Sequence, residues 1–219
     1  MTDWSSDVCK ILEYIKKNRV STTELADCMG KQGLIENAIP LNKKHFIAGK
    51  VHYSYCDDES NWNVHKTIQN VPDNSVVFVD DLGSNNRAIF GDLVAKYLFL
   101  YQQVAGIVTN GKIRDAHTLI KENYPIWSNG ANPVGCFNIE PANPVDKKIL
   151  NSRKSFFENS LIVADDTGVV VITNEFMTEE FYKKLEWIEE QEDIWFDCID
   201  RKKWNTFETV CLKKYEDNK

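Results

Sequence analysis

The chain has 219 residues, of which 42% are hydrophobic and 27% charged, and its formal net charge is −7. This length and balance suit one domain, or one domain with helical extensions, that buries a core of its own. The acidic charge argues against a broad electrostatic surface for nucleic acid or for an anionic membrane, although a local positive site can still bind an anionic substrate. We therefore expect no nucleic-acid partner and no membrane partner.

The six cysteines are widely spaced and include no C-x-x-C pair. This pattern argues against a zinc knuckle or a compact disulfide framework, and it favours free thiols in a reducing compartment. The first residues lack the basic start and apolar run of a signal peptide, and no stretch reaches the roughly 20 apolar residues needed to cross a bilayer. A soluble, cytoplasmic protein is therefore expected.

The beginning of the chain is expected to be helical. Residues 4–17 place apolar side chains on one face, which is typical of an amphipathic helix. Ser21 and Glu24 form a capping box, so a second helix is expected to start there.

The middle of the chain alternates between strand and helix patterns. Apolar or alternating runs predict strands, and apolar residues one turn apart predict helices. The expected elements are a strand over 47–55, a short helix over 62–68, strands over 76–79 and 105–109 on either side of a helix over 91–103, a short helix through 119, and short strands over 125–127 and 134–138. This mixture indicates an α/β or α+β fold with one core.

A hairpin and a charged helical region complete the chain. Residues 161–164 and 169–172 flank the turn sequence D-D-T-G, which predicts a β-hairpin. From residue 178 the pattern is helical and highly charged, with a final helix expected near 201–214. This C-terminal extension is expected to pack on the domain or on a partner.

One candidate site lies where a polar loop leads into a helix at Gly91-Asp92-Leu93-Val94. The first turn of a helix has unpaired backbone N–H groups and the positive end of the dipole, so it can bind a carboxylate or a phosphate. Asp92 could instead simply cap its own helix, and the spacing alone favours that simpler interpretation.

A second candidate site is the loop that ends in Arg114 and Asp115. Arginine has a rigid planar fork that binds a carboxylate at two points, and an aspartate oxygen can hold Mg²⁺ while water fills its other positions. Taken alone, an adjacent Arg–Asp pair is more often an ordinary surface pair.

Together, these segments resemble the RraA-like family, which includes 4-hydroxy-4-methyl-2-oxoglutarate aldolases, related oxaloacetate decarboxylases and the regulator of ribonuclease activity A. The resemblance is carried by G-D-L-V-A at 91–95, by G-I-V-T-N-G-K-I-R-D at 106–115 and by the hairpin at 163–172. It implies an α/β/β sandwich of the swivelling-domain type over 20–175. A helix over 1–19 and a helical extension over 176–219 would flank that domain.

The resemblance also implies a reaction. Arg114 would bind the 2-oxo acid end of a small substrate, Asp115 would hold Mg²⁺ or Mn²⁺, and Asp92 would orient water or accept a proton. The metal would polarise the 2-oxo group, a C–C bond would break, and pyruvate would be formed through its enolate. The expected activity is thus a metal-dependent aldolase or decarboxylase.

The substrate carboxylate is expected at the helix start, bound by the segment of Gly91 and by the backbone N–H groups of Leu93 and Val94. The resemblance further implies a homotrimer or a hexamer with active sites between subunits. A glutamate from a neighbouring subunit would complete the site, and Glu189, Glu190 and Glu192 are equal candidates for it.

The chain departs from the aldolase pattern at three places. Arg114 lies 22 positions after Asp92, one residue more than in the pattern, and the extra residue fits within 101–103 at a helix end. Asn110 and Thr118 stand where acidic residues are usual. These differences leave open a sugar-acid lyase or another lyase activity on the same scaffold.

The alternative from a different class is a non-catalytic regulator that binds a ribonuclease or a helicase. A pure binding protein has no chemical need for Asp115, so its presence favours an enzyme. Two other residues are weaker candidates. His117 is expected on the surface, and Cys136 has no histidine partner that would make it a nucleophile.

Overall fold

The computed structural model describes residues 6–216 of the chain. Helices α1 (Ser6–Asn18) and α2 (Thr22–Cys28) come first. The first matches the helix predicted over 4–17, of which residues 4 and 5 lie outside the described part. The predicted capping box is confirmed, because the Glu24 N–H donates to Ser21 Oγ at 3.2 Å and the Ser21 N–H donates to Glu24 Oε2 at 2.7 Å.

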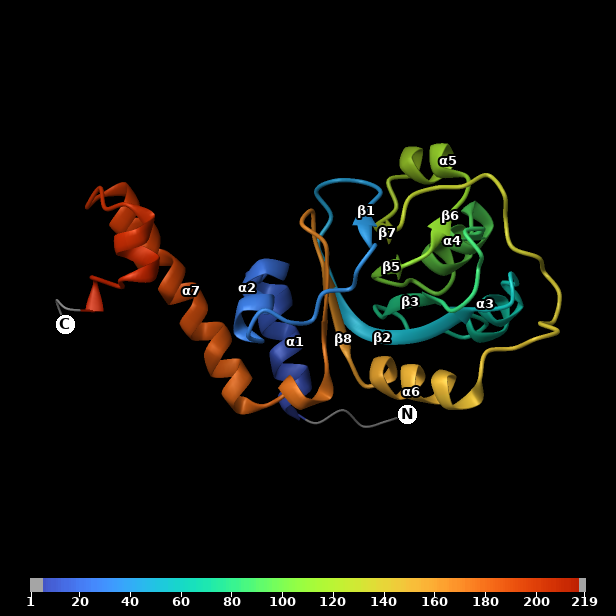
Figure 1. Ribbon diagram of the computed structural model, residues 1–219, viewed down its shortest axis with the longest axis horizontal. Helices are drawn as coiled ribbons and strands as arrows, with labels where there is room; N and C mark the ends of the chain where they lie inside the picture. The colour runs from blue at the N-terminus through green and yellow to red at the C-terminus, as the bar shows by residue number, and fades with distance from the viewer. Residues whose placement is uncertain (1–5, 217–219) are drawn as a thin grey trace.

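A seven-stranded mixed sheet forms the centre of the protein, in the order β1-β7-β5-β3-β2-β8-β9 (Figure 1). The strands are β1 (Ile39–Pro40), β2 (Ile47–Cys56), β3 (Val76–Asp81), β5 (Gly106–Thr109), β7 (Ile126–Ser128), β8 (Leu161–Ala164) and β9 (Val169–Ile172). Strands β2, β3, β5 and β7 are parallel, whereas β1 and the β8–β9 hairpin are antiparallel to their neighbours. Every residue of β5, β8 and β9 is buried, which explains their continuous apolar runs.

A second, two-stranded parallel sheet pairs β4 (Ala88–Phe90) with β6 (Lys112–Ile113). Each of its strands leads directly toward a helix, α4 (Asp92–Leu100) after β4 and α5 (Ala116–Lys121) after β6. The other helices are α3 (Trp62–Thr67), α6 (Lys147–Glu158) and α7 (Glu179–Asp200), with a short 3₁₀ turn at Asn174–Phe176 and a π-helical turn at Phe207–Cys211.

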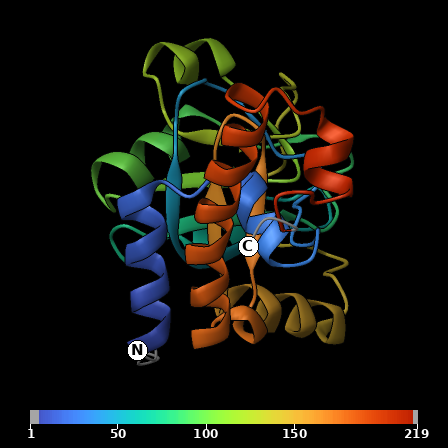
Figure 2. The ribbon, with the colours of Figure 1, turned by 90° about the vertical axis from the view of Figure 1, so that its left-hand side faces the viewer.

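Two groups of helices cover different parts of the large sheet. An apolar cluster that includes Ile11, Leu25 and Leu185 packs α1, α2 and α7 against the β8–β9 hairpin. Another, which includes Val64 and Leu98, packs α3 and α4 against the parallel strands. Figure 2 shows α1 and α7 side by side on the hairpin side of the sheet. The predicted α/β sandwich with helical extensions is therefore confirmed.

Helix α7 extends beyond the body of the protein (Figure 1). Its first half is fastened to α1, where Lys10 Nζ lies 3.1 Å from Glu179 Oε2 and the Tyr14 hydroxyl donates to Glu189 Oε2 at 2.7 Å. Exposed aromatic side chains on α7 include Trp187 and Phe196. No helix within 6–216 is both long enough and apolar enough to cross a membrane.

Two predicted elements are not formed as such in the structure. Residues 134–138 form isolated bridges rather than a strand, because the segment pairs with Ala88 through Gly135 and then changes partner to Ser60 at Phe137. Such a change of partner within three residues prevents a continuous ladder. The helix predicted near 201–214 is reduced to the π-helical turn, after a break that contains Lys203 at a left-handed φ of 58°.

Helix α4 ends at Leu100, before the limit predicted from the sequence. Gln103 has a left-handed φ of 53°, which is incompatible with continued helix. Residues 101–103, where the extra residue relative to the family pattern was expected, therefore form a turn after the helix. Helix α6 was not predicted; Asp146 caps it by accepting the N–H of Lys148 at 2.8 Å.

Candidate functional site

The two candidate segments meet at one end of the small sheet. Strands β4 and β6 are parallel and paired, so the loops that follow them leave from the same edge. The Arg114 N–H donates to the Phe90 carbonyl at 2.9 Å, which joins the two loops directly. Residues far apart in the sequence are thus brought together by the pairing of two short strands.

Glycine at position 91 is required for this close approach. A Cβ built on Gly91 would overlap Asp115 Oδ2 and would lie 2.7 Å from Arg114 Cγ. A Cβ on Gly135 would lie 2.7 Å from Arg114 Nη1 on the other side. The two glycines therefore leave the space that the arginine side chain occupies.

The start of α4 is open toward a ligand. Its N-cap is Gly91, which provides no side-chain cap, and the Asp92 N–H donates instead to Asp115 Oδ2 at 3.2 Å. Within the described residues no acceptor is hydrogen-bonded to the N–H groups of Leu93 and Val94. Asp92 therefore does not cap its own helix, and two free donors remain at the positive end of the helix dipole.

The Arg114 guanidinium is also uncommitted. Its side chain is 47% exposed, and its Nε lies 3.6 Å from Asp115 Oδ2, a separation longer than a hydrogen bond. In the part of the chain from 6 to 216, no side chain or carbonyl accepts a hydrogen bond from this guanidinium. The planar fork is therefore free to bind a carboxylate.

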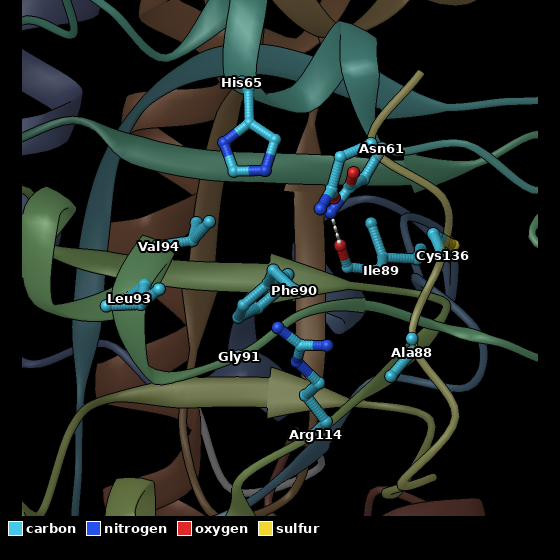
Figure 3. Close-up of a pocket in the computed structure, with 12 residues that line it drawn as sticks. Asn61, His65, Ala88, Ile89, Phe90, Gly91, Leu93, Val94, Arg114 and Cys136 are labelled. Atoms are coloured by element: carbon cyan, nitrogen blue, oxygen red, sulfur yellow. Dashed lines mark hydrogen bonds between the residues drawn. The ribbon is translucent and has the colours of Figure 1, made fainter. Parts of the chain in front are cut away.

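A cavity of about 90 Å³ lies in front of Arg114 (Figure 3). The predicted site residues that line it are Gly91, Leu93, Val94 and Arg114. The side chains of Asp92 and Asp115 lie beside the cavity rather than in its wall, although the Asp115 carboxylate touches the backbone of both Gly91 and Asp92. The structure thus gathers the predicted anion-binding groups in one cavity, with the predicted metal ligand next to it.

Two further residues of this cavity were missed by the sequence analysis. Asn61 is 7% exposed, and its Nδ2 donates to the Ile89 carbonyl at 3.0 Å, while its Oδ1 is buried with no hydrogen-bond partner. His65 lies on the opposite side of the cavity from Arg114 in Figure 3, and partial burial lowers its pKa below the ordinary value. The sequence carried a signal for them, because Asn61 immediately precedes the helix predicted over 62–68 and His65 lies one turn further along.

The described residues contain no preformed cluster of metal ligands. No group of three or more His, Cys, Asp or Glu side chains among residues 6–216 could hold an ion. Asp115 is held by the Asp92 N–H through Oδ2 alone, so Oδ1 is left available. One carboxylate with several waters is a common way to bind Mg²⁺, so Asp115 fits a water-rich site.

The other residues considered from the sequence lie outside the Arg114 cavity or have partners within the fold. Asp165 accepts hydrogen bonds from the Thr22 hydroxyl and the Thr167 N–H, both at 2.8 Å, so its carboxylate is used within the hairpin turn and by α2. Asn110 accepts the Asp81 N–H at 2.7 Å. His117 is exposed, as predicted. All six cysteines are free, as predicted.

Comparison with known proteins matches residues 22–171 to a family model described as "RraA-like: Aldolase/RraA". The chain is 28% identical over 180 residues to a Halalkalibacterium halodurans protein named "putative 4-hydroxy-4-methyl-2-oxoglutarate aldolase", covering 74% of this chain and 77% of that protein. It is 26% identical over 179 residues to protein DlpA of Legionella pneumophila, covering 79% of this chain but only 29% of DlpA.

The fold has a counterpart among solved structures. Streptomyces coelicolor RraAS2, described as an unusual member of the RNase ES inhibitor RraA family, superposes with a TM-score of 0.61 at 20% identity, covering 84% of this chain and 96% of that one. The family model covers more than half of the chain, and the fold agrees with it. The chain therefore belongs to the RraA-like family.

Proposed function

We propose that the protein is a divalent-metal-dependent lyase that cleaves a C–C bond of a small 2-oxo acid and releases pyruvate. The observation that carries this proposal is the open guanidinium of Arg114, which faces the same cavity as the uncapped start of α4. The aldolase name of the Halalkalibacterium relative supports the same reaction class.

Recognition of the 2-oxo acid end follows from these donors. The Arg114 fork binds the carboxylate and the adjacent 2-oxo oxygen, and the N–H groups of Leu93 and Val94 complete the carboxylate site. All of these donors are positioned before the substrate arrives, so little ordering cost is paid on binding. Stabilisation is greatest when negative charge moves onto the 2-oxo oxygen.

Asp115 would hold Mg²⁺ or Mn²⁺ beside Arg114. When bound, the ion would act as a Lewis acid toward the 2-oxo group. The protein's own contribution is to aim the Asp115 carboxylate, which the Asp92 N–H holds through Oδ2 at 3.2 Å. The left-handed φ of 57° at Asp115 places its side chain toward Gly91, whose missing Cβ leaves the room.

Asn61 favours an aldol substrate over a simple decarboxylation substrate. Its buried Oδ1 has no partner and needs a hydrogen-bond donor, because an unpaired buried acceptor is costly. The hydroxyl of a 4-hydroxy-2-oxo acid supplies such a donor, whereas the second carboxylate of oxaloacetate does not. Asp92, whose side chain lies beside the cavity, would take the hydroxyl proton. The bond between carbons 3 and 4 would break, so that carbon 4 leaves as a carbonyl product and the electron pair passes to the enolate of pyruvate. Protonation of carbon 3 would then give pyruvate.

A non-catalytic regulator is the second candidate function. The C-terminal region supports this second function, because it exposes large aromatic side chains. Trp187 and Phe196 on α7 and Phe207 in the turn that follows are each more than half exposed. In that case the free N–H groups and Arg114 would serve no reaction. We further propose that the protein works in the reducing cytoplasm as a homotrimer or a hexamer, with its free thiols and exposed apolar side chains as support.

Proton exchange of pyruvate tests the lyase directly, because it does not require the natural substrate. Wild-type protein with Mg²⁺ in D₂O is expected to remove the pyruvate methyl signal from the NMR spectrum faster than free Mg²⁺ does. A chelator and, separately, Asp115→Ala are expected to return exchange to that background. Wild-type exchange no faster than the background would reject the lyase and favour the regulator.

A further inference from the structure

The cavity in front of Arg114 continues into a second hollow on the outer side of α3 and α4. This apolar annex has a volume of about 290 Å³ and is lined by His65, Ile68, Gln69, Leu93, Val94 and Tyr97. Three of these residues, His65, Leu93 and Val94, also line the Arg114 cavity. Figure 3 shows the three shared residues together on the side of the cavity away from Cys136.

The size of the two spaces matters for the ligand. The Arg114 cavity, at about 90 Å³, has room for the acid end of a substrate but not for a long chain. Together with the annex it reaches the range of about 300–1,000 Å³ that is usual for small-molecule sites. A substrate bound at Arg114 can therefore extend past His65, Leu93 and Val94 into the annex.

The chemistry of the annex is apolar. Ile68 and Val94 are 3% and 6% exposed and form its floor, and Leu93, 74% exposed, stands at its edge. The Tyr97 hydroxyl donates to the Gln69 carbonyl at 2.8 Å and accepts from Gln102 Nε2 at 3.0 Å, so the phenol oxygen is already satisfied and the ring forms a fixed wall. The annex lining contains no arginine, lysine or carboxylate.

We propose that the substrate is a 2-oxo acid whose far end is an uncharged alkyl or aryl group, and that this group lies in the apolar annex. This inference rests on the proposed function and names the substrate class of that same site. A second carboxylate at the far end would enter a space to which the chain contributes no arginine or lysine, which is unfavourable. An apolar end gains affinity by leaving water.

Comparative titration of the full chain tests this assignment, with pyruvate and 2-oxo-4-phenylbutanoate as probes in the presence of Mg²⁺. The phenyl compound is expected to bind roughly tenfold more tightly, because it buries an aromatic ring and a methylene group. Tyr97→Ala should remove that advantage and leave pyruvate affinity unchanged, whereas Tyr97→Phe should retain it. Gln69→Glu, an exposed position, should also weaken only the phenyl compound.

If the wild-type protein binds the two probes with equal affinity, the assignment of an apolar group to the annex is wrong, but the proposed lyase function is unaffected. If the wild-type protein neither binds pyruvate nor catalyses its proton exchange, the proposed lyase function is wrong, and the substrate assignment that rests on it is wrong as well. The same groove could instead be covered by a second copy of the chain. A change of oligomeric state in Tyr97→Ala, measured by light scattering, would overturn the assignment in favour of that contact.

Discussion

Two arginine–aspartate pairs in this protein have opposite geometry. Arg153 on α6 reaches Asp80 at the end of β3 with two hydrogen bonds, from Nε at 2.7 Å and from Nη2 at 2.8 Å. Asp80 is fully buried and also accepts from the Tyr53 hydroxyl at 3.0 Å. Arg114 and Asp115, adjacent in the chain, approach only to 3.6 Å and are both partly exposed.

The difference separates a structural pair from a binding pair. The Nε–Nη2 edge of Arg153 is paired with a carboxylate of its own chain, so this edge fastens α6 to the sheet and is not available for a ligand carboxylate. The Arg114 fork is empty and faces a cavity. A guanidinium that the fold positions but does not satisfy is therefore the better candidate for binding an anion.

The largest effect is expected from breaking the structural pair. Arg153→Met leaves the buried Asp80 carboxylate without its cation and should lower the free energy of unfolding by about 3 kcal/mol. We take the lower end of the usual range because the Arg153 side chain is 39% exposed. Urea unfolding measures the change, with Arg114→Met as the matched control that should lose less than about 1 kcal/mol. Equal losses of unfolding free energy in both variants would contradict the distinction between a structural pair and a binding pair.

The next largest effect is expected in the binding pair. Arg114→Lys keeps the charge but replaces a two-point fork by a single ammonium, so kcat/KM for pyruvate exchange should fall roughly 100-fold. The urea midpoint should stay near that of the wild type, because Arg114 has no hydrogen-bonded acceptor within the described residues. Unchanged kinetics would remove Arg114 from the site.

A smaller effect is expected at Asn61. Asn61→Leu removes the buried Oδ1 at similar volume and should slow cleavage of a 4-hydroxy-2-oxo acid about tenfold. Pyruvate exchange should be nearly unaffected, because pyruvate has no hydroxyl for this oxygen. If both reactions slow equally, Asn61 acts on the fold of the cavity and not on the hydroxyl.

The smallest effect is the dependence of stability on pH between 7 and 5.5. Burial lowers the pKa of His52, although its hydrogen bond to the Thr67 carbonyl at 3.0 Å acts in the opposite direction. The unfolded chain takes up this proton near pH 6.5, before the folded protein does, so stability is complete above that pH and declines below it. His52→Gln should reduce the fall of the urea midpoint over this interval, and the remaining fall includes the contribution of His65, whose pKa is also lowered. A midpoint in the wild type that rises as the pH falls would contradict the sign.

The sequence predicted what depends on neighbouring residues. The capping box at Ser21, the hairpin and the buried strands rest on local chemistry, whereas the role proposed for Arg114 and Asp115 came from the resemblance to a family. Contacts between distant residues could not be predicted in the same way. Asn61 lies 28 positions from its partner Ile89, and Arg153 lies 73 positions from Asp80. Their roles depend on strand pairing and helix packing that no local pattern reveals.

The direct test of the central claim is calorimetric titration of pyruvate into three proteins in the presence of Mg²⁺: wild type, Arg114→Met and Arg153→Met. If the unpaired Arg114 guanidinium binds the carboxylate of the ligand, Arg114→Met should lose pyruvate binding while its urea midpoint is unchanged. Arg153→Met should still bind pyruvate under conditions in which it is folded, and should lose stability instead. Pyruvate binding to Arg114→Met with wild-type affinity would contradict the account.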